Sequence, residues 1–115
     1  YSQLYYQVGN GGLSLRRIAL FARTARDMEP QVARYLSHPG VDFYNEDIFW
    51  SLEANRDQER LKIPHWQEAL QFSFDKNPAV CYELNGHRLP FGCHGWSKKN
   101  MLPFWEQHIQ TLRHG

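Results

Sequence analysis

The sequence predicts a mixed α/β fold with short strands and three or four helices. Short segments rich in aromatic and β-branched residues, such as residues 1–8 and 72–74, have the composition of strands. Apolar residues recur at helical spacing over residues 16–28 and again over residues 98–113. The length of 115 residues suits one domain, so we expect residues 1–115 to form a single domain.

The first half of the chain is expected to contain one strand and two helices. Residues 1–8 form the strand, which leads into a glycine-rich loop. The first helix covers residues 16–28, with apolar residues on one face and arginines on the other. The run His38-Pro39-Gly40 marks a turn. A second helix is expected to start at Asn45, because asparagine is a favoured N-cap residue and two acidic residues follow it.

The second half is expected to alternate between short helices and short strands. A helix starts at Pro64 and runs through Leu70, and residues 72–74 form an edge strand. Residues 79–84 are expected to form a strand that ends in the Asn85-Gly86 turn. The last helix covers residues 98–113, and its apolar positions repeat at helical spacing.

The composition excludes several function classes. Thirteen Lys and Arg against 12 Asp and Glu give a net charge of +1, without the basic excess of a nucleic-acid binder. Aromatic residues make up 15% of the chain, which indicates a folded unit. No apolar run is long enough to span a bilayer, and no leader is visible. The cytoplasm or the cytoplasmic face of a membrane is the expected location. Cys81 and Cys93 are expected to be reduced core thiols.

A glycine-rich segment, Gly9-Asn10-Gly11-Gly12, follows the first predicted strand. Glycine permits positive φ angles and lets another molecule approach the backbone closely. A tight structural turn explains the segment equally well. A dinucleotide-binding loop or P-loop does not, because neither G-x-G-x-x-G nor Gly-Lys-Ser/Thr is present.

Two later segments of the chain carry candidate chemistry. Glu46 and Asp47 open a predicted helix, where acidic residues complement the helix dipole and where a carboxylate stays ionised, as a general base must be. His94 lies between small residues in Gly92-Cys93-His94-Gly95, so it is either a loop hydrogen-bonding residue or a metal ligand. A rival zinc site would use two cysteines and two histidines, namely Cys81, His87, Cys93 and His94, but their spacing matches no finger or ribbon.

Together these segments resemble a known family. GNGGLSLR is similar to the GNGGFSLR signature of a bacterial and fungal glycosyltransferase family formerly catalogued as a domain of unknown function. NEDIFWS resembles the family's acidic segment, about 35 residues after the glycine loop, and PFGCHGW resembles its late Gly-x-His segment. The resemblance covers nearly the whole chain and implies a GT-A fold, the Rossmann-like fold of nucleotide-diphospho-sugar transferases.

The resemblance also implies a role for each candidate residue. Asp47 would be the base that takes the proton of the acceptor hydroxyl, and Glu46 would bind the acceptor or orient the loop. His94 would help to hold Mn²⁺ or Mg²⁺, which neutralises the departing nucleoside diphosphate. The remaining residues implied in substrate binding are Gly9, Asn10, Gly11, Gly12, Arg16, which would meet a phosphate or a carboxylate of the helix start, and Trp96, whose indole would stack on a sugar unless it packs in the core.

One part of the GT-A pattern is missing. Such enzymes bind the nucleotide with an N-terminal half that ends in an Asp-x-Asp metal motif, and the sequence contains no such motif. We therefore expect the C-terminal, acceptor-side half of a larger hexosyltransferase-type enzyme, whose partners are a nucleotide-sugar donor, a glycan or other hydroxyl acceptor, and its own N-terminal half. A usable base favours inversion at the anomeric carbon. The alternatives are a non-catalytic glycan-binding module and a small zinc-stabilised domain.

Overall fold

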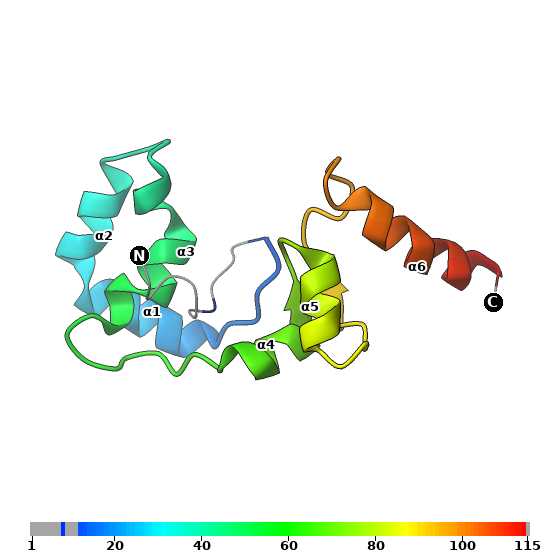
Figure 1. The fold of residues 1–115 in the computed structure, drawn as a ribbon. Helices are drawn as coiled ribbons and strands as arrows, with labels where there is room; N and C mark the ends of the chain where they lie inside the picture. The colour runs from blue at the N-terminus through cyan, green and yellow to red at the C-terminus, as the bar shows by residue number, and fades with distance from the viewer. Residues whose placement is uncertain (1–7, 9–11, 115) are drawn as a thin grey trace. The chain divides into compact units, whose positions relative to one another are not determined.

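The computed structural model describes residue 8 and residues 12–114, and it describes side chains as far as residue 109 (Figure 1). The chain divides into two compact units, residues 1–65 and residues 66–115. Most of the strand predicted over residues 1–8, together with Gly9, Asn10 and Gly11, lies outside the described residues. The prediction of a single domain stays a prediction.

All regular secondary structure in the described residues of the first unit is helical. Helix α1 (Ile18–Asp27) is followed directly by α2 (Glu29–Leu36), and Met28 is the junction residue between them. A 3₁₀ turn, Asp42–Tyr44, precedes α3 (Glu46–Ser51), and a second 3₁₀ turn, Glu53–Asn55, follows it. The helices α1, α2 and α3 pack against one another in this order, α2 contacting both of the others.

A small aromatic core holds these three helices together. Met28, Tyr35, Phe49, Ala54 and Leu61 are all at most 7% exposed. The rings of Tyr35 and Phe49 meet edge to face, with centroids 5.2 Å apart, which is a favourable arrangement for two aromatic rings. This contact between Tyr35 of α2 and Phe49 of α3 holds the two helices together.

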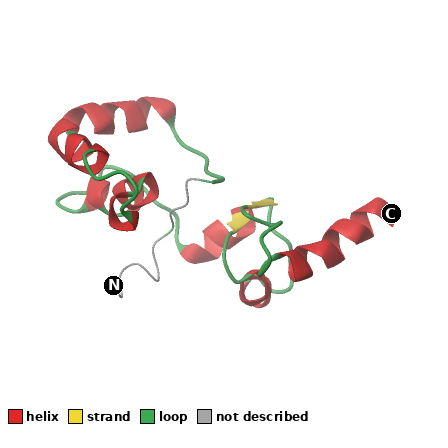
Figure 2. Ribbon diagram, turned by 90° about the horizontal axis from the view of Figure 1, so that it is seen from above, coloured by secondary structure: helices red, strands yellow, loops and turns green. Residues whose placement is uncertain are grey.

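The second unit combines helices with a very short parallel sheet. Helix α4 (Trp66–Phe72) runs into β1 (Ser73–Phe74), and α5 (Pro78–Leu84) leads back to β2 (Gly92–Cys93). The two strands pair in parallel, with Ser73 opposite Gly92 and Phe74 opposite Cys93 (Figure 2). A parallel pair needs a crossover connection, and α5 supplies it. The chain continues into α6 (Leu102–His114).

Phe74 is the centre of the second core. Phe74 is fully buried. Beside it lie Met101, directly before α6 and 2% exposed, and Trp105, in the first turn of α6 and 6% exposed. The rings of Phe74 and Trp105 lie 5.9 Å apart. Because Phe74 belongs to β1, its burial anchors the two-stranded sheet to α6.

The structure confirms some of the predicted elements and corrects others. The described residues contain helices and a parallel sheet, so the mixed α/β class holds at that level, but they contain six α-helices rather than three or four. The prediction of a strand over residues 79–84 was wrong, because these residues lie in α5. Pro78 occupies the first turn of that helix, where its fixed φ and missing N–H are tolerated, and Gly86 with φ 65° follows its end.

Helix α2 was not expected either. The first helix is predicted to end at residue 28, whereas Pro30 occupies the first turn of a new helix. The helices expected at residues 16–28, Asn45, Pro64 and 98–113 are present, with slightly different bounds. No helix in the described ranges is both long and apolar enough to cross a lipid bilayer.

Candidate functional site

A hollow of about 320 Å³ lies in the first unit, between α2 and the start of α3. Its volume is at the lower end of the range for small-molecule sites, about 300–1,000 Å³. Helices α1, α2 and α3 line it, together with the chain that connects α2 to α3. The lining residues are Ala25, Val32, Tyr35, Leu36, His38, Pro39, Gly40, Tyr44, Asn45, Glu46, Phe49 and Trp50.

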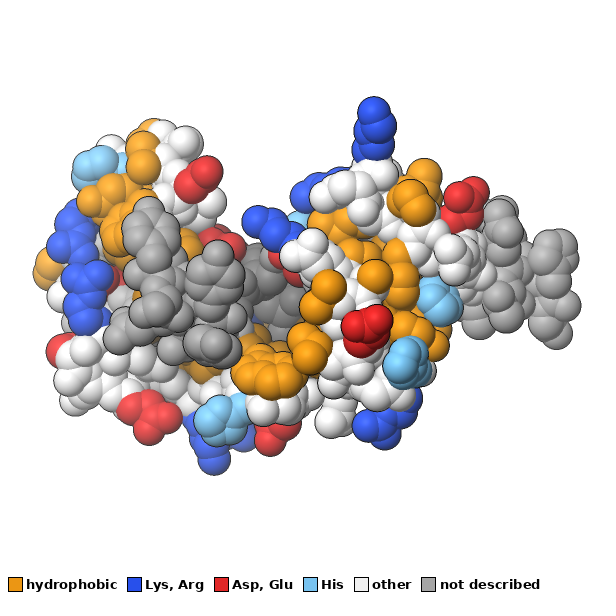
Figure 3. Space-filling view, in the orientation of Figure 1, with side chains coloured by type: hydrophobic (Ala, Val, Ile, Leu, Met, Phe, Trp, Pro, Cys, Tyr) orange, Lys and Arg blue, Asp and Glu red, His pale blue; other side chains and the backbone are white. Residues whose placement is uncertain are grey.

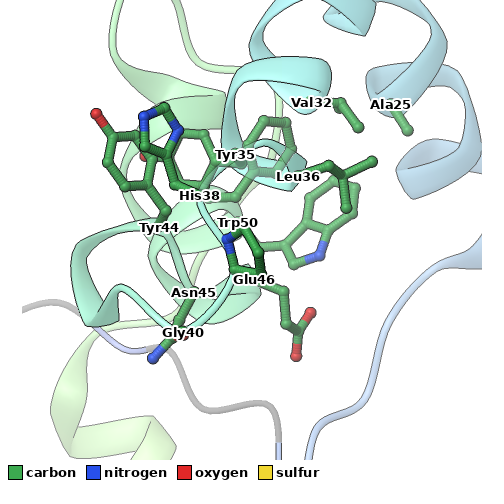
Figure 4. A pocket seen from close by; sticks show the side chains of 12 residues that line it. Ala25, Val32, Tyr35, Leu36, His38, Gly40, Tyr44, Asn45, Glu46 and Trp50 are labelled. Carbon is green, nitrogen blue, oxygen red and sulfur yellow. The ribbon is translucent and has the colours of Figure 1, made fainter.

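Aromatic rings form much of the wall of this hollow. The imidazole of His38 stacks on the ring of Tyr44 at 4.2 Å with an interplanar angle of 16°. Figure 4 shows this pair on one side of the hollow, with Leu36 and the indole of Trp50 on the other. His38 is held in place because its Nδ1 lies 2.8 Å from the carbonyl oxygen of Arg34. This part of the wall is therefore formed by flat rings, and the contact with the Arg34 carbonyl holds the His38 ring in its orientation.

Glu46 supplies a carboxylate to the hollow. It is the first residue of α3, and its carboxylate forms two contacts with the guanidinium of Arg16, at 3.1 Å and 3.0 Å. The guanidinium carbon of Arg16 also lies 5.6 Å from the ring centre of Phe21 and 5.9 Å from that of Trp50. These distances are typical of cation–π contacts. Arg16 thus meets a carboxylate of the helix start, one of the two partners considered for it.

Asp47 lies beside Glu46 but differs in its surroundings. Its Oδ1 accepts a hydrogen bond of 2.9 Å from the backbone N–H of Ile48, and the side chain is half-buried. Its Oδ2 has no hydrogen-bond partner among the described residues. Of the acidic pair, Glu46 alone is among the described residues that line the hollow. The backbone of Asn45 caps α3 as predicted, although no hydrogen bond from its side chain contributes to the cap.

Of the glycine-rich segment, Gly12 alone belongs to the described residues. It is exposed, and the chain bends there before it reaches Arg16 and α1. The predicted roles of Gly9, Asn10 and Gly11 fall outside the described residues. Four residues after Gly12, Arg16 forms an ion pair with Glu46 at the start of α3. This ion pair links the chain that follows the glycine-rich segment to α3.

His94 belongs to the second unit and forms a pair with a carboxylate that the sequence did not single out. Its Nδ1 lies 3.1 Å from Oδ1 of Asp75. Both side chains are partly accessible, at 38% for His94 and 32% for Asp75. The short parallel sheet explains the proximity, since Asp75 directly follows β1 and His94 directly follows β2. The ladder continues one step further through the hydrogen bond from the backbone N–H of His94 to the carbonyl of Phe74, 3.1 Å long.

The loop after His94 depends on a glycine. Gly95 has φ 66°, and a Cβ added there would meet the side chain of Lys98 at 3.0 Å. The backbone N–H of Lys98 donates to the carbonyl oxygen of Gly95 and closes the turn. Trp96, inside this turn, is 46% exposed, so its indole is not a core residue and is accessible to a ligand.

The described residues do not form a complete metal site. No group of three or more His, Cys, Asp or Glu side chains in the described ranges is placed to hold a metal ion. The carboxylate of Asp75 is a hydrogen-bond partner of His94, and the role of His94 as a metal ligand stays a prediction. The rival site of Cys81, His87, Cys93 and His94 does not form such a group.

The two cysteines are free and half-buried, as expected for core thiols. Burial raises the pKa of both Cys81 and Cys93, so the thiol form is favoured in each. Cys81 also donates to the carbonyl oxygen of Lys76 at 3.3 Å. This places both residues in a structural role.

Several residues that shape these sites were missed in the sequence. Asp75 follows the strand predicted at residues 72–74, and its position at a strand end was the available signal. His38, which the sequence marks only as part of a turn, is exposed and stacks on Tyr44. Trp50 lies in the helix predicted to start at Asn45; its ring centroid is 4.6 Å from that of Phe21, and it also lines the hollow.

Large apolar side chains are exposed in both units. Figure 3 shows hydrophobic side chains gathered on one face of the second unit. Phe91, which belongs to this unit, is 83% exposed. In the first unit, Leu15 and Ile18 are 87% and 84% exposed. Exposed apolar groups of this size mark surfaces that other parts of a protein can cover.

The comparison with known proteins gives one match. The model of a family described as "Protein of unknown function (DUF5672)" matches residues 1–94, from the first residue to the histidine of the Asp75–His94 pair. The match spans well over half of the chain, which therefore belongs to this family. No curated protein and no solved structure matches the chain.

Proposed function

We propose that this member of the DUF5672 family is the acceptor-side part of a metal-dependent GT-A glycosyltransferase, which transfers a sugar from a nucleotide sugar to a hydroxyl group. The observation that supports this proposal best is the aromatic hollow of about 320 Å³ at the start of α3. It combines flat apolar walls with the carboxylate of Glu46, and Asp47 is the next residue along the helix. The resemblance of the GNGGLSLR, NEDIFWS and PFGCHGW segments to glycosyltransferase motifs is the second support.

An acceptor sugar suits the chemistry of this hollow. The C–H face of a pyranose is apolar and packs on aromatic rings such as Trp50 and Tyr44. Its hydroxyl groups need hydrogen-bond acceptors, which a carboxylate provides. Arg16 holds the carboxylate of Glu46 in a defined orientation, which favours recognition of one particular hydroxyl.

In the proposed reaction, Asp47 accepts the proton of the acceptor hydroxyl. The oxygen then attacks the anomeric carbon of the donor, the bond from that carbon to the nucleoside diphosphate breaks, and the diphosphate leaves with the bonding electrons. A single displacement of this kind inverts the anomeric carbon. Glu46 binds the acceptor beside the base. A divalent metal, bound in part by His94, would neutralise charge on the leaving diphosphate.

The exposed apolar residues support the view that the chain is part of a larger enzyme. Leu15, Ile18 and Phe91 are each more than 80% exposed. A sheet of two strands with two residues each also leaves both of its edges unpaired among the described residues. A nucleotide-binding half that extends the sheet and covers these side chains would account for both features.

The direct test is the release of nucleotide from a panel of nucleotide sugars by the full-length natural protein, with and without Mn²⁺. Metal-dependent release from one donor, increased by a hydroxyl acceptor, would support the proposal. The Asp47→Asn variant, which keeps the shape of the side chain, is the matched control and should release nucleotide about 100-fold more slowly or less. Absence of release across the panel from the folded protein would contradict the transferase.

A glycan-binding module is the second candidate, favoured by the location of the hollow. All of its lining residues belong to the first unit, so the hollow forms without a donor half. Saccharide titrations followed by NMR test this candidate. Shifts at Trp50 and Tyr44 without nucleotide release would favour a binding module over a transferase.

A further inference from the structure

We propose that Asp75 positions the imidazole of His94, so that its Nε2 atom is presented as a ligand for a divalent metal ion. The choice of the metal as ligand rests on the proposed function, whereas the positioning rests on the geometry of the second unit alone. Neither the family description nor the sequence motifs assign a role to Asp75.

The argument starts from the hydrogen bond between the two side chains. A neutral imidazole carries one N–H, and the nitrogen without the proton is the one that can bind a metal. An ionised carboxylate only accepts hydrogen bonds, so Asp75 selects the form of His94 with the proton on Nδ1. Nε2 then carries the lone pair, and it has no hydrogen-bond partner among the described residues.

The backbone makes this arrangement rigid. Asp75 directly follows β1 and His94 directly follows β2. The hydrogen bond from the backbone N–H of His94 to the carbonyl oxygen of Phe74 holds the ends of these two strands together. Phe74, immediately before Asp75, is fully buried in the core. On the other side of the pair, Gly95 directly follows His94 and begins a turn that the hydrogen bond from the Lys98 N–H closes. The carboxylate and the imidazole are therefore set by the sheet and not by flexible side chains alone.

The accessibility of His94 agrees with a ligand at Nε2. Its side chain is 38% exposed, so one edge of the ring faces Asp75 while other atoms meet solvent. In metal sites generally, a carboxylate on the second ring nitrogen orients the histidine and raises its basicity as a ligand. Loss of such a carboxylate typically reduces metal affinity by about 10–100-fold.

The test is NMR spectroscopy of the full chain with ¹⁵N-labelled histidine rings at pH 8, where an ordinary imidazole is neutral. The signals of His94 are identified by their loss in His94→Gln. In the wild-type protein we expect the proton on Nδ1. In Asp75→Ala it should move to Nε2, the form that free histidine prefers, whereas Asp75→Asn should retain it on Nδ1, because the amide oxygen still accepts a hydrogen bond.

A titration with Mn²⁺ alone then tests the metal. The paramagnetic ion should broaden the His94 signals, and Asp75→Ala should need a roughly tenfold higher concentration for the same broadening. Asp57→Ala, which removes an exposed carboxylate of the first unit, is the matched control and should behave as wild type. A wild-type proton on Nε2, or an unchanged tautomer in Asp75→Ala, would overturn the positioning role. Retained positioning without broadening would instead remove the metal from the proposed function.

Discussion

Arg16 and Glu46 form a two-pronged ion pair, although 30 positions separate them in the sequence. The Nη2 atom of Arg16 lies 3.1 Å from Oε1 of Glu46, and its Nη1 atom lies 3.0 Å from Oε2. Arg16 leads from the glycine-rich segment into α1, and Glu46 begins α3. The pair therefore joins two of the three segments on which the proposed function rests, and it does so at the edge of the aromatic hollow.

Replacement of Arg16 by alanine should affect activity far more than stability. The two side chains are 30% and 56% exposed, and a pair of this kind contributes at most about 1 kcal/mol to the free energy of unfolding. Without Arg16, the carboxylate of Glu46 loses its orientation, and we expect kcat/KM for transfer to fall by about 10–100-fold. Urea unfolding and the transfer assay measure the two effects. Arg17→Ala is the control; equal activity in both variants would contradict the role of the pair.

The two acidic residues should respond differently to amide substitution. Asp47→Asn removes the proposed base, so kcat should fall by about 100-fold or more while KM stays similar. Glu46→Gln should mainly raise KM for the acceptor, because Glu46 lines the hollow. Initial rates at varied acceptor concentration distinguish the two patterns. Near-full activity of Asp47→Asn would show that Asp47 acts only as an acidic residue at a helix start.

The sequence predicts the helices of this chain better than its strands. Helix α1 has a clear apolar face, and α3 begins after an N-cap residue, so local patterns were sufficient for both. Residues 79–84 contain β-branched and aromatic residues and were therefore predicted as a strand. In the structure, the left-handed conformation of Asn77 and the ring of Pro78 begin a helix there, and composition alone does not reveal this.

The candidate site was predictable only in part, because its key contacts join distant segments. The acidic pair and His94 stand out as motifs in the sequence. The partner of His94 does not, since Asp75 becomes its neighbour only through the pairing of β1 with β2. The hollow likewise depends on how α2 packs against α3, and α2 itself was not expected. Long-range pairing, which no single-sequence pattern encodes locally, accounts for what was missed.

The surroundings of Glu53 predict that two neighbouring arginines, Arg34 and Arg56, contribute differently to stability. The side chain of Glu53 is 5% exposed, and its Oε1 accepts a hydrogen bond of 2.7 Å from Arg34. Arg56 lies 2.9 Å from Oε2, but without the geometry of a hydrogen bond. Arg34→Ala should therefore lower the free energy of unfolding by about 1–3 kcal/mol, because a buried carboxylate oxygen loses its partner. Arg56→Ala should cost less than about 1 kcal/mol. Chemical denaturation of both variants measures the difference, and equal losses would contradict this account.

Asp57 offers a test that depends on pH. The hydrogen bond from Arg60, with its Nη1 2.5 Å from Oδ1, lowers the pKa of the Asp57 carboxyl from 3.8 to about 2. A carboxyl group whose pKa is lower in the folded than in the unfolded state stabilises the folded state at any pH above its ordinary pKa. For Asp57 this stabilisation is lost as the pH falls from about 4 to about 2. NMR titration of the side-chain carboxyl should give a midpoint near 2 in the wild type. In Arg60→Ala it should return toward 3.8, whereas Arg56→Ala should leave it unchanged. A wild-type midpoint at the ordinary value would show that the Arg60 contact does not persist in solution.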